Sequence, residues 1–287
     1  MCPKTLKKSL KKELRAKRNK SHGPLWVLIP VLLLAVAAGG ALVWKNRRPA
    51  QLLDQGIRFE QQNQQTKALE RYALLYEDYA ASPQAAEALY RSGRILQHDQ
   101  GRDQEALLRY LQLENAYPQS PFAVHAQQQA AELTKHRLDD CGQAIPIYQR
   151  LIDEVDSDAG HYLYEIADCY ARLENWSQAA IEFEALVTSE PSSELKAIGI
   201  FRLAEARLLN HQREDARSGY QRMVDDFPAN QLTQEARFRL AEMLEEDEHL
   251  REALQAYAEL TEYPRQDLIK QKIQNLKKRM ARKKKVL

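Results

Sequence analysis

The hydrophobic positions between residues 160 and 191 fall into two groups, each spaced three and four residues apart. This spacing predicts two amphipathic helices, each with one apolar face. Between them, Asn175 can end the first helix and Ser177 can cap the second, which Pro191 ends. The segment therefore predicts a helical hairpin, with apolar positions Leu163, Ile166, Ala167 and Tyr170 in the first helix and Ala179, Phe183 and Leu186 in the second.

A similar pattern recurs along most of the chain. Six pairs of an alanine and an aromatic residue four positions later lie in near-register, with successive alanines 38, 38, 35, 37 and 37 residues apart. Since one hairpin cannot cover its own apolar face, several hairpins have to stack before a core exists. The pairs are Ala68/Tyr72, Ala106/Tyr110, Ala144/Tyr148, Ala179/Phe183, Ala216/Tyr220 and Ala253/Tyr257. Twelve or thirteen positions before each alanine lies a small residue, namely Gly56, Gly93, Ala131, Ala167, Ala204 or Ala241.

These positions resemble the tetratricopeptide repeat family, although Leu163 stands where the family has Trp and Asp156 where it has Pro. The resemblance implies an all-α, right-handed α-solenoid of about six hairpins over residues 50–264. The repeat steps mostly exceed the family's period of about 34 residues. They are more similar to periplasmic members that act in bacterial outer-membrane assembly or coordinate the Tol-Pal system. The matching positions are Ala167, Tyr170, Ala179, Phe183 and Pro191, with further repeat-ending prolines at Pro118, Pro228 and Pro264.

An uncharged segment at residues 24–44 precedes the repeats. As a helix, its twenty-one residues would span about 31 Å, which matches the hydrocarbon core of a bilayer. The basic arm at residues 1–23 holds nine Lys/Arg, so it is expected to stay in the cytoplasm. We expect one transmembrane helix that anchors a periplasmic array in the inner membrane. A cleaved signal peptide and the opposite orientation are the alternatives.

Residues 265–287 are expected to form a capping helix with a basic tail. One face of this helix can shield the open side of the last repeat. The tail, from Arg279 to Lys285, has three alternatives: contact with anionic lipid, folding back on acidic repeats, or solvation without a target. The apolar face consists of Ile269, Ile273, Leu276 and Met280.

Charge is segregated along the chain. Residues 1–48 hold twelve Lys/Arg and one acid, residues 265–287 hold ten and one, and the part between them holds 20 basic and 38 acidic residues. An acidic array is a poor phosphate binder, so we expect no nucleic-acid partner. No phosphate-binding loop, nucleophile elbow or zinc motif occurs in the sequence, and we therefore predict no enzymatic activity, no cofactor and no metal site.

The candidate site is a peptide groove. In the resembling family, the first helices of successive repeats line a concave surface, and the position three before the small residue faces it. An aromatic ladder edged by carboxylates would suit a basic peptide. The alternative is that helix packing buries the rings. The ladder positions are Tyr90, Tyr164, Phe201 and Phe238, interrupted by Gln128, and their neighbours include Arg94, His161, Asp168, Glu205, Glu242 and Glu245.

The predicted function is a membrane-anchored periplasmic scaffold for protein–protein interaction in cell-envelope assembly or maintenance. One alternative is a holdase that binds exported chains through the same groove. Another is a structural protein whose repeats self-associate into a homo-oligomer. Of the three cysteines, Cys141 and Cys169 could form an internal disulfide, the alternative being two small buried side chains.

Overall fold

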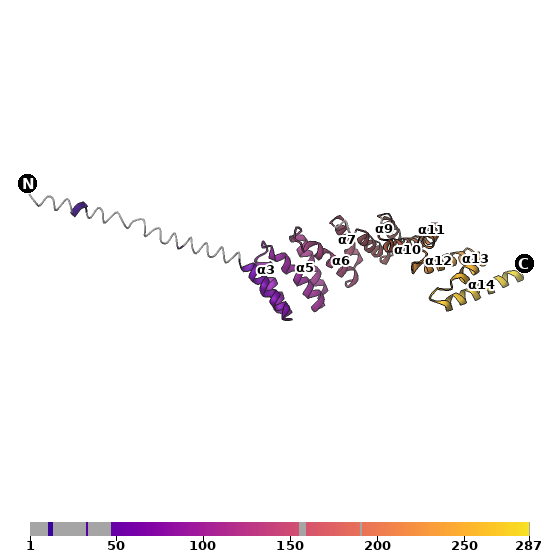
Figure 1. Ribbon diagram of the computed structural model, residues 1–287, viewed down its shortest axis with the longest axis horizontal. Helices are drawn as coiled ribbons and strands as arrows, with labels where there is room; N and C mark the ends of the chain where they lie inside the picture. The colour runs from indigo at the N-terminus through magenta and orange to yellow at the C-terminus, as the bar shows by residue number, and fades with distance from the viewer. Residues whose placement is uncertain (1–10, 14–32, 34–46, 155–158, 190, 287) are drawn as a thin grey trace, which may run out of the picture. The chain divides into compact units, whose positions relative to one another are not determined.

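Figure 1 shows the computed structural model, in which the helices follow one another along the chain. The structure describes residues 11–13, 33, 47–154, 159–189 and 191–286, and these ranges contain no strand. Apart from Leu33, the predicted membrane segment lies outside the described residues, as does most of the basic arm. Within the described part, no helix is both long enough and apolar enough to cross a membrane.

The chain divides into two compact units, and the first ends at Ile95. Its helices are 47–61, α3 (Gln65–Asp78) and α4 (Gln84–Arg94). Tyr72 of α3 lies so close to Gly56 that a Cβ added to this glycine would be 2.3 Å from the ring. The Tyr72 hydroxyl donates a hydrogen bond to Glu60 at 2.8 Å. The small residue of the repeat pattern is therefore needed for a close contact between two helices.

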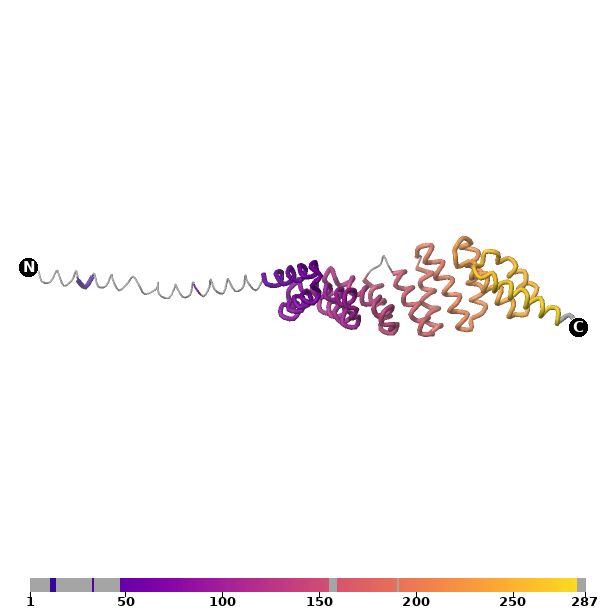
Figure 2. The backbone as a smooth tube through the Cα atoms, turned by 90° about the horizontal axis from the view of Figure 1, so that it is seen from below, coloured from indigo at the N-terminus to yellow at the C-terminus, as the bar shows by residue number. Residues whose placement is uncertain are grey.

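The second unit begins at Leu96, and its helices from α5 to α14 each pack against the next. In addition, α10 contacts both α8 and α12, which are the first helices of the neighbouring hairpins. Figure 2 shows the helices of this unit side by side, ending in yellow at α14. The elements are η1 (Ile95–Asp99), α5 (Asp103–Ala116), α6 (Ala123–His136), α7 (Cys141–Glu154), α8 (Ala159–Arg172), α9 (Trp176–Thr188), α10 (Ser193–Leu209), α11 (Arg213–Asp226), α12 (Leu232–Glu246), α13 (Leu250–Glu259) and α14 (Gln266–Val286).

The alanine and aromatic positions of the repeat are almost completely buried. All six alanines are 0% exposed, and the aromatic residues that follow them are at most 2% exposed. The four alanines at the upstream small-residue positions are also 0% exposed. In the fifth hairpin, a Cβ added to Gly219 of α11 would lie 2.8 Å from the Cβ of Ala204 in α10. The predicted helical repeat is therefore confirmed at equivalent helix contacts.

One residue in each hairpin loop adopts a left-handed backbone conformation, five positions before the repeat alanine. Only the second repeat has a glycine there, although this conformation costs other residues roughly 1 kcal/mol. The sequence analysis missed this regularity because the residue type varies from loop to loop. The residues are Asn63 (φ 56°), Gly101 (φ 63°), Asp139 (φ 54°), Glu174 (φ 56°), His211 (φ 60°) and Glu248 (φ 62°).

The loop between α8 and α9 differs from its prediction. The capping residue of α9 is Asn175 and not Ser177, because the Asn175 side chain accepts a hydrogen bond from the backbone N–H of Gln178 at 3.3 Å. The helix before it has already ended at Arg172. Asn175 thus begins the second helix and does not stop the first.

The last helix, α14, packs against α13 with the face that the sequence predicts. Ile269 is 3% exposed and Leu276 is 0% exposed, while Ile273 and Met280 are half-buried against the same cluster. This cluster also contains Tyr257 of the last hairpin. The helix therefore covers apolar surface that would otherwise be open to water at the end of the array.

Removal of the hydroxyl from two repeat tyrosines of the second unit should affect stability differently. The Tyr110 hydroxyl donates a hydrogen bond to buried Gln97 at 2.8 Å, whereas the Tyr220 hydroxyl is buried with no partner. We expect Tyr110→Phe to destabilise the unit by about 1–2 kcal/mol and Tyr220→Phe to be neutral or stabilising. Urea unfolding of both full-length variants in detergent, followed by circular dichroism, measures the difference. Equal losses would contradict it.

Candidate functional site

Two open hollows lie along α10 where it runs beside α8. The first, of about 610 Å³, is lined by Tyr164, Glu194, Ile198, Phe201, Arg202 and residues 229–232. The second, of about 360 Å³, is lined by Asp168, Ala171, Arg172, Trp176, Phe183, Arg202, Glu205, Ala206 and Leu209. Arg202 borders both hollows, so the two adjoin at its side chain. The surface formed by these two hollows is called the α8–α10 groove below.

Four residues of the predicted groove are brought together here. Tyr164 and Phe201 line the first hollow, and Asp168 and Glu205 line the second. Tyr164 is half-buried, and its ring lies 6.1 Å from the ring of Phe183, measured between centroids. Tyr164 thus forms part of the groove wall and also packs against Phe183, the aromatic residue of its own hairpin.

The predicted aromatic ladder is wrong at Phe238 and only partly right at Phe201. Both rings are core residues, 3% and 4% exposed, and each lies 5.8 Å from the repeat tyrosine of its hairpin, Tyr257 or Tyr220. Phe238 also stacks on Tyr263 at 4.8 Å, which covers its other side. Packing within each hairpin therefore buries these rings, and only the small exposed part of Phe201 reaches the groove.

Three predicted residues lie away from the α8–α10 groove. Half-buried Tyr90 and exposed Arg94 are on α4 of the first unit, which is a separate compact body. Exposed His161 is on α8, where its Nε2 lies 3.9 Å from Glu165. None of the three lines either hollow.

All four predicted groove carboxylates are paired with cations of the chain itself, which argues against a basic peptide as the ligand. Asp168 lies 2.6 Å from Lys135, and Glu205 lies 3.0 Å from Arg202. Neutralised carboxylates attract an approaching cation less than free ones do. The other two pairs are Glu242 with Arg239 (3.1 Å) and Lys272 (3.2 Å), and Glu245 with Lys272 (3.1 Å) and Arg279 (3.0 Å).

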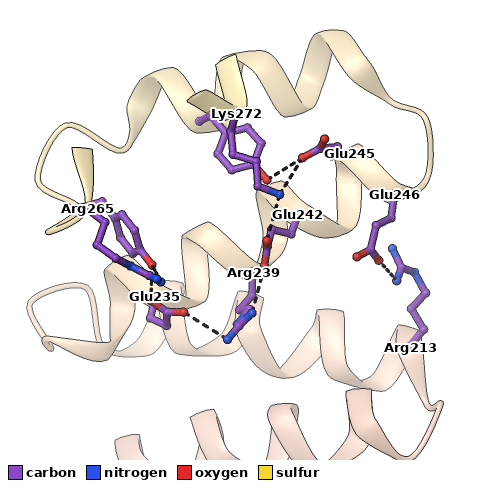
Figure 3. A network of polar contacts seen from close by, with 10 residues as sticks. Arg213, Glu235, Arg239, Glu242, Glu245, Glu246, Arg265 and Lys272 are labelled. Carbon is purple, nitrogen blue, oxygen red and sulfur yellow. Dashed lines mark hydrogen bonds and ion pairs between the residues drawn. The ribbon is translucent and has the colours of Figure 1, made fainter. Parts of the chain in front are cut away.

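Glu242 and Glu245 are wrongly assigned to a peptide groove, because α14 covers them. Figure 3 shows Lys272 of this helix reaching both carboxylates, beside the pair that Glu242 makes with Arg239. Burial alone lowers the pKa of Lys272, but its bonds to the two glutamates outweigh this effect and raise the pKa. The part of the basic tail at Arg279 thus folds back on the acidic repeats, one of the three predicted alternatives.

A buried ion cluster behind the groove was missed by the sequence analysis. Lys135 of α6 is 2% exposed, and its Nζ lies 2.5 Å from Glu165 and 2.6 Å from Asp168, both on α8. Burial lowers the pKa of Lys135, but the two carboxylates outweigh it and raise the pKa. Lys135 therefore stays protonated, and its ion pairs join the third hairpin to the fourth.

Cys141 and Cys169 are both buried and both free. The predicted alternative of two small buried side chains therefore describes the structure, in which the disulfide is not formed. Neither thiol belongs to a metal site, since no three His, Cys, Asp or Glu side chains in the described ranges are placed to hold an ion.

Comparison with protein families supports the predicted type of repeat. Two segments, residues 87–120 and 137–194, match models of the tetratricopeptide repeat. The second segment includes α7, α8 and α9, and therefore one side of the α8–α10 groove. No curated protein matches the chain in a sequence search. The finer resemblance to periplasmic members stays a prediction.

Two solved structures show the same fold. The C-terminal part of a TPR repeat-containing protein from Cytophaga hutchinsonii is 14% identical and covers 77% of this chain and 86% of its own, with a TM-score of 0.55. The structure of Naa15/Naa10 bound to HypK-THB is 15% identical and covers 83% of this chain, with a TM-score of 0.52. The match spans 35% of that second chain. At these identities the likeness establishes the helical-repeat fold alone.

Replacing Lys135 tests the buried ion cluster. We expect Lys135→Met to destabilise the second unit by about 3–5 kcal/mol, because buried Glu165 and half-buried Asp168 would lose their shared cation. Adding Glu165→Gln and Asp168→Asn should restore part of the loss by removing both charges. The matched control is Lys278→Met, at an exposed position of α14. Urea midpoints that do not differ between Lys135→Met and the control would disprove the assigned role.

Proposed function

We propose that this protein is a membrane-anchored, periplasmic docking scaffold that holds a segment of a partner protein in the α8–α10 groove. The observation that carries this proposal is the pair of adjoining hollows on the first helices of two successive repeats. Tetratricopeptide repeats are generally non-catalytic scaffolds for protein interaction, and such a role needs a surface and not a reactive group.

The chemistry of the groove favours a partner segment with apolar anchors and little net charge. Ile198 and Tyr164 offer apolar surface in the first hollow, and Trp176 and Leu209 do so in the second. Leu209 is 50% exposed, so its apolar surface is available to a bound segment. Because Asp168 and Glu205 of the groove are already paired with Lys135 and Arg202, apolar contact and shape would supply most of the affinity.

Arg202 lies between the two hollows as a hydrogen-bond donor. Its side chain is 47% exposed, and its pair with Glu205 uses Nη1. A guanidinium carries five N–H donors, so the same side chain can also donate to a carbonyl oxygen of a bound backbone. Arg202 would then fix the position of the segment between its two anchors.

The spacing of the hollows sets the spacing of the anchors. Ile198 and Ala206 are eight residues apart on α10, or about 12 Å at a rise of about 1.5 Å per residue. An extended chain advances about 3.3 Å per residue. Two apolar side chains about four positions apart in an extended segment would therefore reach both hollows.

The proposed membrane location rests on two features of the sequence. Residues 24–44 are uncharged and long enough to span a bilayer, and the basic arm before them favours a cytoplasmic N-terminus. An array in the periplasm would meet envelope proteins and exported chains. Cell-envelope assembly or maintenance is accordingly the proposed setting.

A peptide array tests the docking proposal with the full chain in lipid nanodiscs. The bound peptides should share two apolar residues three to five positions apart and should carry little net charge. Ile198→Asp and Leu209→Asp should each weaken binding of a selected peptide about tenfold, the equivalent of about 1.4 kcal/mol. Leu108→Asp is the control, because Leu108 is an exposed leucine, 57% accessible, on α5 outside the groove.

The other outcomes separate the alternative functions. Binding of most apolar peptides regardless of anchor spacing would indicate a holdase. Binding of no peptide, together with a mass that rises with concentration, would indicate a self-associating structural protein. Equal effects of the three aspartate substitutions would place the binding surface elsewhere and contradict the proposal.

A further inference from the structure

Two buried thiols lie on helices that pack against each other. Cys141 is the first residue of α7 and is 4% exposed, and Cys169 lies in α8 and is 0% exposed. The two helices belong to successive hairpins, and α7 packs directly on α8. A covalent link between these cysteines would therefore join the third repeat to the fourth.

The two thiols are neighbours in one small region of the core. Arg172, three residues after Cys169, pairs with Asp139, two residues before Cys141, so the end of α8 lies beside the start of α7. The Cys141 thiol is also one of the groups that raise the pKa of the Cys169 thiol, after burial itself. Both also lie near the ring hydroxyl of Tyr148, which is buried and has no hydrogen-bond partner of its own. In a disulfide the sulfurs are about 2 Å apart, and packing of α7 on α8 with both cysteines buried places the two side chains in the same helix interface.

We propose that Cys141 and Cys169 are oxidised to an intramolecular disulfide that joins α7 to α8, with a small-molecule or protein disulfide as the oxidant. This inference rests on the proposed periplasmic location, since disulfides form and persist in that compartment. The link lies on α8, the helix that presents Tyr164 and Asp168 to the α8–α10 groove. It would hold one wall of the groove in place against the preceding repeat.

The exchange balances without any other redox partner. The Cys141 thiolate, from the more exposed of the two thiols, attacks one sulfur of the donor disulfide and releases one donor thiolate. The Cys169 thiolate then attacks the Cys141 sulfur of the mixed disulfide and releases the second donor thiolate. The two protons lost by the cysteines end on the two released thiols, so the protein pair is oxidised and the donor disulfide is reduced.

The surroundings of Cys169 affect the rate of the second step. Burial raises the pKa of the Cys169 thiol, whereas the ammonium of Lys135 nearby lowers it. The thiolate is the reacting form, so the buried lysine assists a reaction that burial slows. Formation of the disulfide during folding, when both thiols are accessible, avoids the penalty of burial.

Thiol trapping in cells tests the disulfide directly. Cells that make the full chain with Cys2→Ser are quenched with acid, and the denatured protein is alkylated with a maleimide before and after reduction. We expect no alkylation before reduction and two adducts after it. In Cys141→Ala and Cys169→Ala, the remaining thiol should be alkylated without reduction. Reduction of the purified protein should lower its midpoint of thermal unfolding by roughly 5–10 °C.

Oxidation of the purified, reduced chain tests whether the disulfide can form, independently of the proposed periplasmic location. Incubation with oxidised glutathione should form the pair, with loss of the mass of two hydrogen atoms. Two free thiols after this treatment would overturn the proposed disulfide, whatever the location of the protein. A pair that oxidises in the tube but stays reduced in quenched cells would instead overturn the periplasmic location, and with it the disulfide in the cell.

Discussion

The structure depends on close contact between helices at positions where only small side chains fit. A hairpin of two amphipathic helices leaves one apolar face uncovered, and only the next hairpin can bury it. Alanines that are 0% exposed mark these contacts in every repeat. At one such contact in the second unit, a Cβ on Gly219 would lie 2.8 Å from the Cβ of Ala204. The groove follows from this packing, because the same stacking places α8 and α10 side by side.

Much of the fold could be predicted because its determinants are local in sequence. The spacing of Ala179 and Phe183 indicates which face of the helix is buried, and the recurrence of such pairs along the chain indicates the length of a repeat. The apolar face of α14 could be predicted for the same reason. The left-handed loop positions could not be predicted, because residue types such as Glu174 and His211 do not indicate a left-handed backbone. In these loops, the geometry of the connection between the two helices determines the backbone conformation, and several residue types can adopt it.

The candidate site was less predictable because its chemistry depends on residues far apart in the sequence. Asp168 has the spacing of an exposed groove residue, but its charge is taken up by Lys135, thirty-three positions earlier. Glu245 likewise pairs with Lys272 of the capping helix. Periodicity shows which face of a helix a residue lies on but not what lies opposite. In the groove, Asp168 and Glu205 are consequently paired and not free, and Arg202 lies between two hollows of mixed polar and apolar lining.

The central claim is that the array, and with it the groove, exists because small residues let successive helices approach. The most direct measurement is the urea midpoint of full-length Ala204→Leu in detergent, compared with Ala281→Leu, which is at an exposed position of α14. Inserting a larger side chain into a packed contact costs about 1–3 kcal/mol. The account predicts a clearly lower midpoint for Ala204→Leu and an unchanged midpoint for Ala281→Leu. Equal midpoints for the two variants would contradict it.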